Sequence, residues 1–401
     1  MEKDLNSFFN AKSIAVIGAS NTEGKVGNIL MKKLKSYKGK VIPINKSEKK
    51  VLNIKSYKKI LDYPKKIELA IIAIPGKFIP KIILECVKKE IKNIIIISSG
   101  FSEIGNNKLQ NKIIRLKQKY NLNILGPNCF GIINQKKNLD LTFAKQKSKK
   151  GDTVFISQSG ALGSYVIDFN IGLRGFISLG NMIDLEFADW IEYFNKDKKV
   201  KKIVCYIEKL KDGKRFLEVC KNSSKKIIVV KSGKTEKGQK AILSHTASLG
   251  TDSKIYSGVF KQAKIKEVNS LIQAFGIKPE KIDAALKGKK IAIITNAGGA
   301  GALLTDQLEQ KDYEVDLLED ILGTAKPNDY KKALQKLKPA YDSILVVLTP
   351  QTMSEAEETA RIILSSRYKE KIIACFLGEK SISSSLNFLR KHKIPYCTKC
   401  V

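Results

Sequence analysis

The sequence lacks any long hydrophobic run. Its apolar stretches, such as residues 94–97, have the length of a β-strand. They fall far short of the ~20 residues that a membrane-spanning helix needs. The chain opens with a short polar segment, Met1 to Phe9, and not with the basic, hydrophobic and small-residue pattern of a secretion signal. We therefore expect a cytoplasmic protein with no membrane partner.

Histidine is scarce, with 2 residues among 401, and the 7 cysteines are scattered without a paired framework. Scattered cysteines in a cytosolic chain favour reduced thiols over disulfides. Cys397 and Cys400 form one C-x-x-C motif, but no second pair of ligands accompanies it. No metal site is expected in this chain.

Acidic residues are few, 39 against 73 lysines and arginines, which gives a net charge of +34. A nucleic-acid-binding protein would concentrate its basic residues in one stripe with aromatic residues between them. Here lysine is spread through every segment, which favours a compositional bias and makes nucleic acid the weaker alternative. The resulting positive field would attract polyanionic small molecules such as CoA and ATP.

Apolar, β-branched runs alternate with Lys- and Glu-rich helical stretches along the whole chain. This pattern predicts parallel sheets covered by helices on both faces, a doubly wound α/β architecture. We divide the chain into three α/β domains at residues 1–138, 150–285 and 286–401, and interpret the polar stretch 135–150 as a linker.

Each domain opens with a strand, a turn of small residues and the start of a helix. The turns begin at Gly18, Ser157 and Asn296. Small residues let backbone N–H groups approach an anion, and a helix N-terminus adds about half a positive charge. Phosphate-bearing ligands are the expected guests, although glycine at such a junction also serves close packing.

The first turn could belong to an NAD-binding protein, which would carry an acidic residue at the end of the second strand to hold the ribose. Asn45 and Lys46 stand at that place instead. Lys46 suits a ligand with additional phosphates, so CoA fits better than NAD, and an NAD-dependent oxidoreductase is disfavoured.

The motifs, read in order, resemble one family over nearly the whole chain. The matching stretches are IAVIGASNTEGKVGN (14–28), VIPIN (41–45), LAIIAIP (69–75), IIISSGFSEIG (95–105), LGPNCFGIIN (125–134), FISQSGALG (155–163), SLGNMIDLEFADW (178–190), YIEKLKDGKRF (206–216), SHTASLGTD (244–252), AIITNAGGAG (292–301) and VLTPQTM (347–353). The family is that of the α subunit of ADP-forming acetate–CoA ligase, or NDP-forming acyl-CoA synthetase, related to the succinyl-CoA synthetase α subunit. The resemblance implies a Rossmann-like CoA-binding domain followed by two flavodoxin-like, succinyl-CoA-synthetase-type domains.

The resemblance also implies a CoA site in the first domain. The residues that it assigns to CoA are Gly18, Ser20, Gly24, Lys25, Val26, Ile74, Pro75, Ser98, Ser99, Gly100, Asn128 and Cys129. For Pro75, as for Pro127 beside the site, simple strand termination is the alternative reading, because proline cannot continue a ladder of hydrogen bonds.

The family's catalytic histidine corresponds to His245, which the sequence already singles out. One of the chain's 2 histidines, it lies in the hydroxyl-rich, glycine-bounded segment 244–250, where we expect a loop. Its partner by resemblance is Glu208, expected as an exposed carboxylate at a strand end; an ordinary strand-end charge is the alternative. One imidazole nitrogen can then act as nucleophile while the carboxylate holds the other.

By the same resemblance, Ser159, Gly160 and Ala161 would cradle the phosphate on His245 through backbone N–H groups at a helix start. Lys231 and Lys234 add positive charge nearby. His392, between two lysines, is expected on the surface.

The implied activity is that of an acid–thiol ligase. Acyl-CoA, ADP and phosphate would be interconverted with a carboxylic acid, CoA and ATP through an acyl phosphate and a phosphohistidine. No segment resembles the ATP-grasp domains that hold the nucleotide and its Mg²⁺ in this family. We therefore expect a separate ATP-grasp β subunit in an α2β2 heterotetramer.

The third domain departs from the family pattern. A helix-and-loop segment is missing around residues 314–323, and the chain stops soon after Tyr396, so this domain is expected to be shortened. That departure keeps open an alternative, a catalytically idle CoA-binding regulatory or scaffold protein. Neither the acid nor the choice between ADP and GDP follows from these residues.

Overall fold

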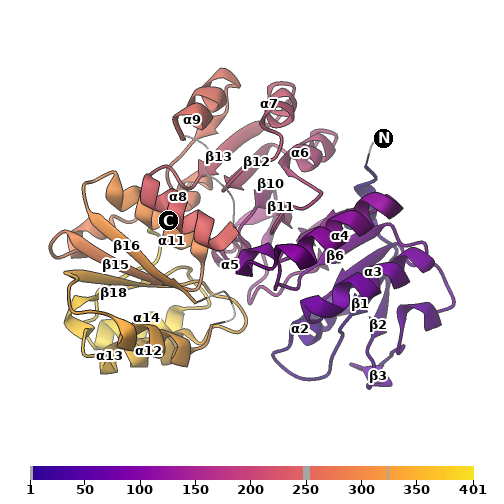
Figure 1. The fold of residues 1–401 in the computed structure, drawn as a ribbon, viewed down its shortest axis with the longest axis horizontal. Coiled ribbons are helices and arrows are strands. Elements are labelled where there is room, and N and C mark those ends of the chain that lie inside the picture. The colour runs from indigo at the N-terminus through magenta and orange to yellow at the C-terminus, as the bar shows by residue number, and fades with distance from the viewer. Residues whose placement is uncertain (1–2, 247–252, 322, 324) are drawn as a thin grey trace.

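The computed structural model describes residues 3–246, 253–321, 323 and 325–401; the side chains of residues 243–246, 253, 254 and 318 lie outside this description as well. Three large sheets with helices packed on them lie side by side along the molecule (Figure 1). The first sheet lies at one end in indigo, and the third at the other end in orange and yellow. None of the described helices is both long and apolar enough to cross a membrane.

The first sheet contains five parallel strands in the order β2-β1-β5-β6-β7. Its strands are β1 (Ser13–Ile17), β2 (Lys40–Ile44), β5 (Leu69–Ile72), β6 (Asn93–Ile96) and β7 (Asn123–Leu125). Its helices are α1 (Asn6–Asn10), α2 (Val26–Lys33), α3 (Ile79–Lys88) and α4 (Asn107–Tyr120), and a small hairpin is formed by β3 (Lys50–Val51) and β4 (Ile54–Lys55). Every residue of β5 and β6 is buried, as expected for strands covered on both faces.

The second sheet has seven strands in the order β14-β13-β12-β10-β11-β8-β9. They are β8 (Ile132–Asn134), β9 (Leu139–Asp140), β10 (Lys149–Ser157), β11 (Gly172–Ser178), β12 (Lys202–Ile207), β13 (Lys226–Lys231) and β14 (Lys266–Glu267). The helices are α5 (Gly160–Asp168), α6 (Phe187–Asn195), α7 (Gly213–Lys221), α8 (Glu236–Thr246), α9 (Ser253–Gln262) and α10 (Leu271–Ala274).

The stretch 135–150, interpreted as a linker, carries regular structure. Strand β9 lies within it and pairs antiparallel with β8, which in turn pairs antiparallel with β11. Residues just before 138 therefore extend the second sheet, while the division of the chain into three domains remains our interpretation.

The third sheet has five parallel strands in the order β16-β15-β17-β18-β19. They are β15 (Lys290–Thr295), β16 (Glu314–Asp320), β17 (Ser343–Leu348), β18 (Ile372–Phe376) and β19 (Tyr396–Cys397). The helices are α11 (Gly298–Glu309), α12 (Pro327–Lys336), α13 (Ala356–Ser365) and α14 (Ser383–Lys391).

The parallel strands of all three sheets share one topology. Numbered in chain order within each sheet, they lie in the order 2-1-3-4-5, with β8 and β9 added at one edge of the second sheet. In such sheets the connections leave in opposite directions on either side of strand 1, and ligands bind beyond the carboxyl ends of strands 1 and 3. The fold therefore predicts three candidate binding positions, after β1 and β5, after β10 and β12, and after β15 and β17.

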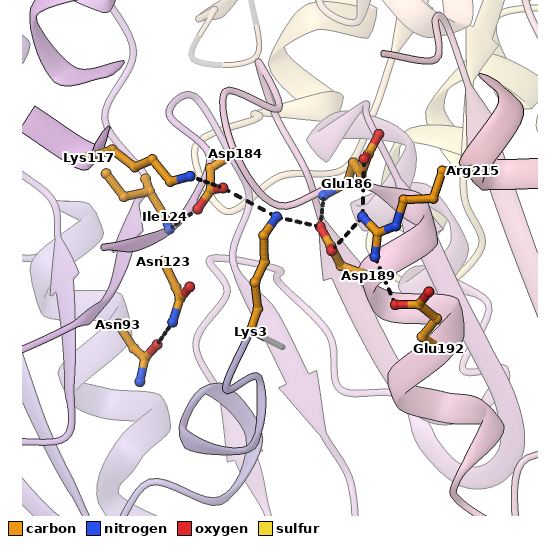
Figure 2. Close-up of polar contacts among 10 residues, drawn as sticks. All are labelled: Lys3, Asn93, Lys117, Asn123, Ile124, Asp184, Glu186, Asp189, Glu192 and Arg215. Atoms are coloured by element: carbon orange, nitrogen blue, oxygen red, sulfur yellow. Dashed lines mark hydrogen bonds and ion pairs between the residues drawn. The ribbon is translucent and has the colours of Figure 1, made fainter. Parts of the chain in front are cut away.

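A buried ion network joins the first sheet to the second (Figure 2). The Asp184 carboxylate accepts a hydrogen bond from the backbone N–H of Ile124 in β7 at 2.9 Å and pairs with Lys117 of α4 at 2.9 Å. Lys3 lies between Asp184 and Asp189, at 3.3 and 3.0 Å. Asp189 also pairs with Arg215 at 2.8 Å. The network fixes α4 and β7 against α6 and α7.

Replacing Asp184 by alanine is expected to lower the free energy of unfolding by about 2–4 kcal/mol, because the buried Ile124 N–H and Lys117 lose their partner and Lys3 keeps only Asp189. Asp184→Asn should lose less, because its amide oxygen can still accept from Ile124. Asp152→Ala removes an exposed carboxylate 3.9 Å from Lys201 and should change stability by no more than about 0.5 kcal/mol. Urea denaturation compares the three variants. Equal midpoints for Asp184→Ala and Asp152→Ala would contradict the role of this network.

Candidate active site

The three candidate binding positions open into one cavity of about 560 Å³. The first sheet contributes Gly18 after β1 and residues 73–75 after β5. The second contributes residues 158–161 after β10, and the third contributes residues 296–298 after β15 and Gln351 after β17. Turns that follow strands of all three sheets therefore line one cavity, at positions that the topology favours for ligands.

Most residues assigned to CoA line this cavity. They are Gly18, Gly24, Lys25, Val26, Ile74, Pro75, Ser98, Ser99, Asn128 and Cys129. The three residues assigned to phosphate, Ser159, Gly160 and Ala161, line it too. The structure thus brings together groups that are up to 143 residues apart in sequence (Gly18 to Ala161), which makes one continuous site for both ligands geometrically possible.

Ser20 and Gly100 are not part of the cavity lining. In both turns, an acidic side chain of the chain itself binds the polar groups that were expected to face a ligand. The Ser20 hydroxyl lies 3.2 Å from Glu48 Oε1, and Glu48 also accepts from the backbone N–H of Asn21 at 3.0 Å. The Gly100 N–H donates to Glu103 Oε1. These N–H groups are therefore occupied by carboxylates within the chain.

The turns at the ends of β5, β6 and β7 are held together by short polar contacts. Ser98 Oγ accepts from the Ile74 N–H at 3.1 Å, and the Ser98 carbonyl accepts from the Asn128 N–H at 2.9 Å. The Cys129 thiol donates to the Ile96 carbonyl at 3.3 Å, and burial raises its pKa to about 12. Cys129 is therefore a protonated, unreactive thiol that shapes the wall of the cavity.

Two helix N-termini, those of α5 and α11, point into the cavity. Both turns use the same local hydrogen bond: Ser157 Oγ donates to the Ser159 carbonyl at 2.7 Å, and Thr295 Oγ1 donates to the Ala297 carbonyl at 3.0 Å. The two turns touch, because a Cβ added to Gly299 would lie only 3.0 Å from Ser159 Cβ. Two adjacent helix N-termini form an anion site of unusual positive potential.

Glu208 follows β12, the third of the parallel strands of the second sheet in chain order. We expected an exposed strand-end carboxylate, and this expectation is wrong: Glu208 is buried, because β12 lies between β10 and β13 in the sheet interior. Its backbone N–H donates to Gln158 Oε1 at 2.6 Å, and its carbonyl accepts from Lys231 Nζ at 2.9 Å. Glu208 is therefore fixed directly behind Gln158, a residue of the cavity wall.

Lys231 is a buried cation at this end of the second sheet. Burial lowers its pKa to about 8, against the opposing effect of the carboxylates of Asp306 and Glu208. Its Nζ lies 4.9 Å from the centroid of the Tyr256 ring. Lys231 thus remains mostly protonated at neutral pH and places a positive charge beside Glu208.

Helix α8, which carries His245, is anchored by a third-domain carboxylate. Asp306 of α11 accepts from the backbone N–H groups of Gly233, Lys234 and Thr235 at 2.7, 2.8 and 2.9 Å. Thr235 Oγ1 in turn accepts from the Gly238 N–H at 3.0 Å, capping α8. Figure 1 shows α8 beside α11, and Ala241, Ile242 and Ala302 form the apolar contact between them.

The histidine segment differs from the expected loop at its start. Helix α8 extends through Thr246, so the backbone of His245 is helical. The His245 side chain and residues 247–252 lie outside the described part of the chain, and the assignment of His245 stays a prediction.

Several cavity residues were absent from the sequence-based assignment. Gln158 and residues 296–298 lie in turns that the sequence marked as anion sites without assigning each residue a ligand, whereas Glu103, Phe143, Gly323, Gln351 and Met353 had no assigned role. The sequence contained a hint for three of these positions. Gln158, Asn296 and Gln351 lie within three residues of the end of parallel strand 1 or 3 of their sheets, where ligands bind in this topology. The sequence does not reveal strand order, so these positions could not be distinguished from other strand ends.

The fold and the cavity define a class of protein, a three-sheet α/β protein whose strand-end turns share one ligand cavity. Residues 12–135 match the model of the CoA binding domain family, and residues 150–278 match the succinyl-CoA ligase like flavodoxin domain. The II subunit alpha of ADP-forming acetate–CoA ligase from Pyrococcus furiosus is 36% identical over 98% of this chain and 94% of that protein. The chain belongs to the family of ADP-forming acetate–CoA ligase α subunits.

Two further relatives agree with this assignment. The ADP-forming acetate–CoA ligase of Methanocaldococcus jannaschii is 44% identical over 82% of this chain, which spans 46% of that protein. The dinucleotide forming acetyl-coenzyme A synthetase 1 of Ca. Korarchaeum cryptofilum, solved with phosphate and ADP, superposes with a TM-score of 0.66 at 29% identity, covering 99% of this chain and 94% of that chain. The predicted family and fold class are confirmed.

Proposed function

We propose that this chain is the CoA-binding, phosphate-carrying subunit of an ADP-forming acyl-CoA synthetase. Phosphate attacks the thioester carbonyl, the C–S bond breaks, and CoA leaves as acyl phosphate forms. An imidazole nitrogen of His245 then attacks the phosphorus atom and releases the carboxylate. The phosphohistidine finally transfers its phosphoryl group to ADP, and every step is reversible.

A single observation carries this proposal, namely that one cavity joins the predicted CoA turns to the two helix N-termini. A thioester held by the first-sheet turns would meet phosphate held by α5 and α11 without leaving the cavity. The N-termini stabilise the oxyanions that develop during attack and transfer. Because Cys129 stays protonated, it does not compete with CoA for the acyl group.

Glu208 is the proposed partner of the His245 imidazole, and Lys231 balances its charge. The carboxylate would hold the proton on one ring nitrogen so that the other remains nucleophilic. Ser20 and Gly100 contribute to the CoA turns through their backbone conformation, since Glu48 and Glu103 occupy the groups that would contact a ligand.

The nucleotide requires a partner. We propose an ATP-grasp β subunit, in an α2β2 heterotetramer, that holds ADP with its Mg²⁺ and receives the phosphoryl group. The family relative solved with phosphate and ADP supports the use of both substrates. A cytoplasmic location suits these substrates. The idle scaffold alternative is not favoured, because the chain retains both His245 and Glu208.

Turnover of the full chain with its ATP-grasp subunit tests the proposal. We expect ATP formation from acetyl-CoA, ADP and phosphate, and CoA binding by the chain alone in calorimetry, with no heat from NAD. A complex that binds CoA yet forms no ATP with acetyl-CoA or with branched or aryl acyl-CoA would support the scaffold alternative. Absence of CoA binding would refute the proposal altogether.

A further inference from the structure

Gln351 is a buried amide in the part of the cavity wall that the third sheet contributes. It follows β17, strand 3 of that sheet, and only 3% of the residue is exposed. Its Oε1 is buried and has no hydrogen-bond partner among the described residues. A buried amide oxygen without a partner is costly unless a ligand supplies the missing donor.

The segment around Gln351 is held firmly beside the N-terminus of α11. Asn296 Oδ1, at the turn before α11, accepts from the Thr349 N–H at 2.8 Å and from its hydroxyl at 3.0 Å. On the other side, Thr352 Oγ1 donates to the Phe143 carbonyl at 2.6 Å. The backbone on both sides of Gln351 is therefore fixed, and its side chain is held in the cavity wall beside the turn that precedes α11.

Gly323 has no side chain, and the Gln351 amide occupies the space where one would lie. A Cβ at position 323 would lie 2.8 Å from Gln351 Nε2 and 3.2 Å from its Oε1. Any larger residue there would displace the amide from its place.

The other amides near the two helix N-termini are already engaged. Gln158 Oε1 accepts from the N–H groups of Glu208 and Lys209, at 2.6 and 3.0 Å. Asn296 Oδ1 accepts from Thr349, as described above. Gln351 is thus the amide whose oxygen, among these three, remains available to a ligand.

The chemistry of an amide distinguishes phosphate from the carboxylate product. The amides of the pantetheine arm of CoA also donate and accept, and the KM for acetyl-CoA tests that alternative. The Gln351 amide donates through Nε2 and accepts through Oε1, and so does hydrogen phosphate, which carries both P–OH and P–O⁻. A carboxylate only accepts, and would leave Oε1 without a partner. The positive ends of α5 and α11 also favour the doubly charged phosphate over a carboxylate at this place.

We propose that Gln351 is a phosphate-binding residue: its Nε2 donates to a phosphate oxygen and its Oε1 accepts from the P–OH group of the inorganic phosphate that attacks the thioester. This inference rests on the proposed function and assigns the group that recognises one of its substrates. It gives the third domain a direct part in the chemistry.

Two variants at this position test the proposal in the complex with the ATP-grasp subunit. Gln351→Met keeps the length and removes both hydrogen bonds, and Gln351→Glu adds a negative charge. Each should raise KM for phosphate roughly 10- to 100-fold, as expected for lost hydrogen bonds to a charged group. KM for acetyl-CoA should stay within about twofold. Gln146→Glu is the matched control, because Gln146 lies outside the cavity lining and donates to Ser381 Oγ at 3.2 Å.

Direct phosphate binding keeps this test separate from that of the proposed function. Calorimetry of inorganic phosphate with the wild-type complex and with Gln351→Met needs no turnover. Weaker binding to the variant, with CoA binding unchanged, supports the proposal even in a complex that makes no ATP. Equal phosphate binding overturns it, as does a change confined to KM for acetyl-CoA, which would assign Gln351 to the acyl group. Both substitutions preserve the length of the side chain, so each variant is expected to fold. CoA binding reports whether it has.

Discussion

Replacing His245 by alanine is expected to abolish ATP formation and the labelled phosphoenzyme together. If the phosphoryl group passes through the imidazole, Cys129 cannot replace it, because burial holds that cavity residue as a thiol. CoA binding should be unaffected, because the substitution removes only a side chain from α8, which packs on α11, and leaves the first-sheet turns with the predicted CoA residues in place.

The measurement is incorporation of label from γ-labelled ATP into the complex, followed by acid and base treatment. Phosphohistidine is labile to acid and stable to base, so wild type should show a label with that behaviour. His392→Ala is the matched control, since that histidine is exposed at the end of α14 with its ring 4.4 Å from the centroid of Phe388. A label that persists in His245→Ala, or disappears in His392→Ala, would contradict the assignment.

The sheets could be predicted from the sequence because their signal is local. The run at 69–74 contains β5 and the run at 94–97 overlaps β6, and their apolar character follows from burial on both faces. The small-residue turns after β1, β10 and β15 were likewise visible, and all three reach the cavity. Family resemblance then assigned roles to residues that the pattern alone could only describe as turns.

The parts of the site that could not be predicted depend on contacts between distant residues. Asp306 lies 71–73 residues from the N–H groups that it binds before α8. Glu48 lies 27 residues from Asn21. In a sequence these carboxylates look like ordinary surface charges, because only the packing of helices and turns brings them to backbone donors.

The exposure of a residue at a strand end also depends on contacts between distant parts of the chain. Glu208 was expected at an exposed edge, but strand order places β12 inside the sheet. The lack of a hydrogen-bond partner at Gln351 Oε1 among the described residues is even harder to predict from the sequence. It depends on the positions of all the residues around the amide, and these are known only from the structure.

Glu208→Gln should slow phosphorylation of His245 by roughly 100-fold or more, while leaving CoA binding within about twofold of wild type. The amide keeps the shape of the carboxylate, and the backbone stays fixed by Gln158 and Lys231. What it loses is the negative charge that orients the imidazole and stabilises its positive form during transfer. The loss is large because Glu208 is buried, where charge is weakly screened.

Single-turnover labelling with γ-labelled ATP measures this rate directly. Glu218→Gln, which changes an exposed carboxylate on α7, is the matched control and should label at the wild-type rate. A thermal melt separates catalysis from folding, since the isosteric amide should leave the midpoint within a few degrees of wild type, about the shift that 1 kcal/mol produces. If Glu208→Gln labels as fast as Glu218→Gln, the buried carboxylate does not serve His245, and its fixed place behind Gln158 is structural only.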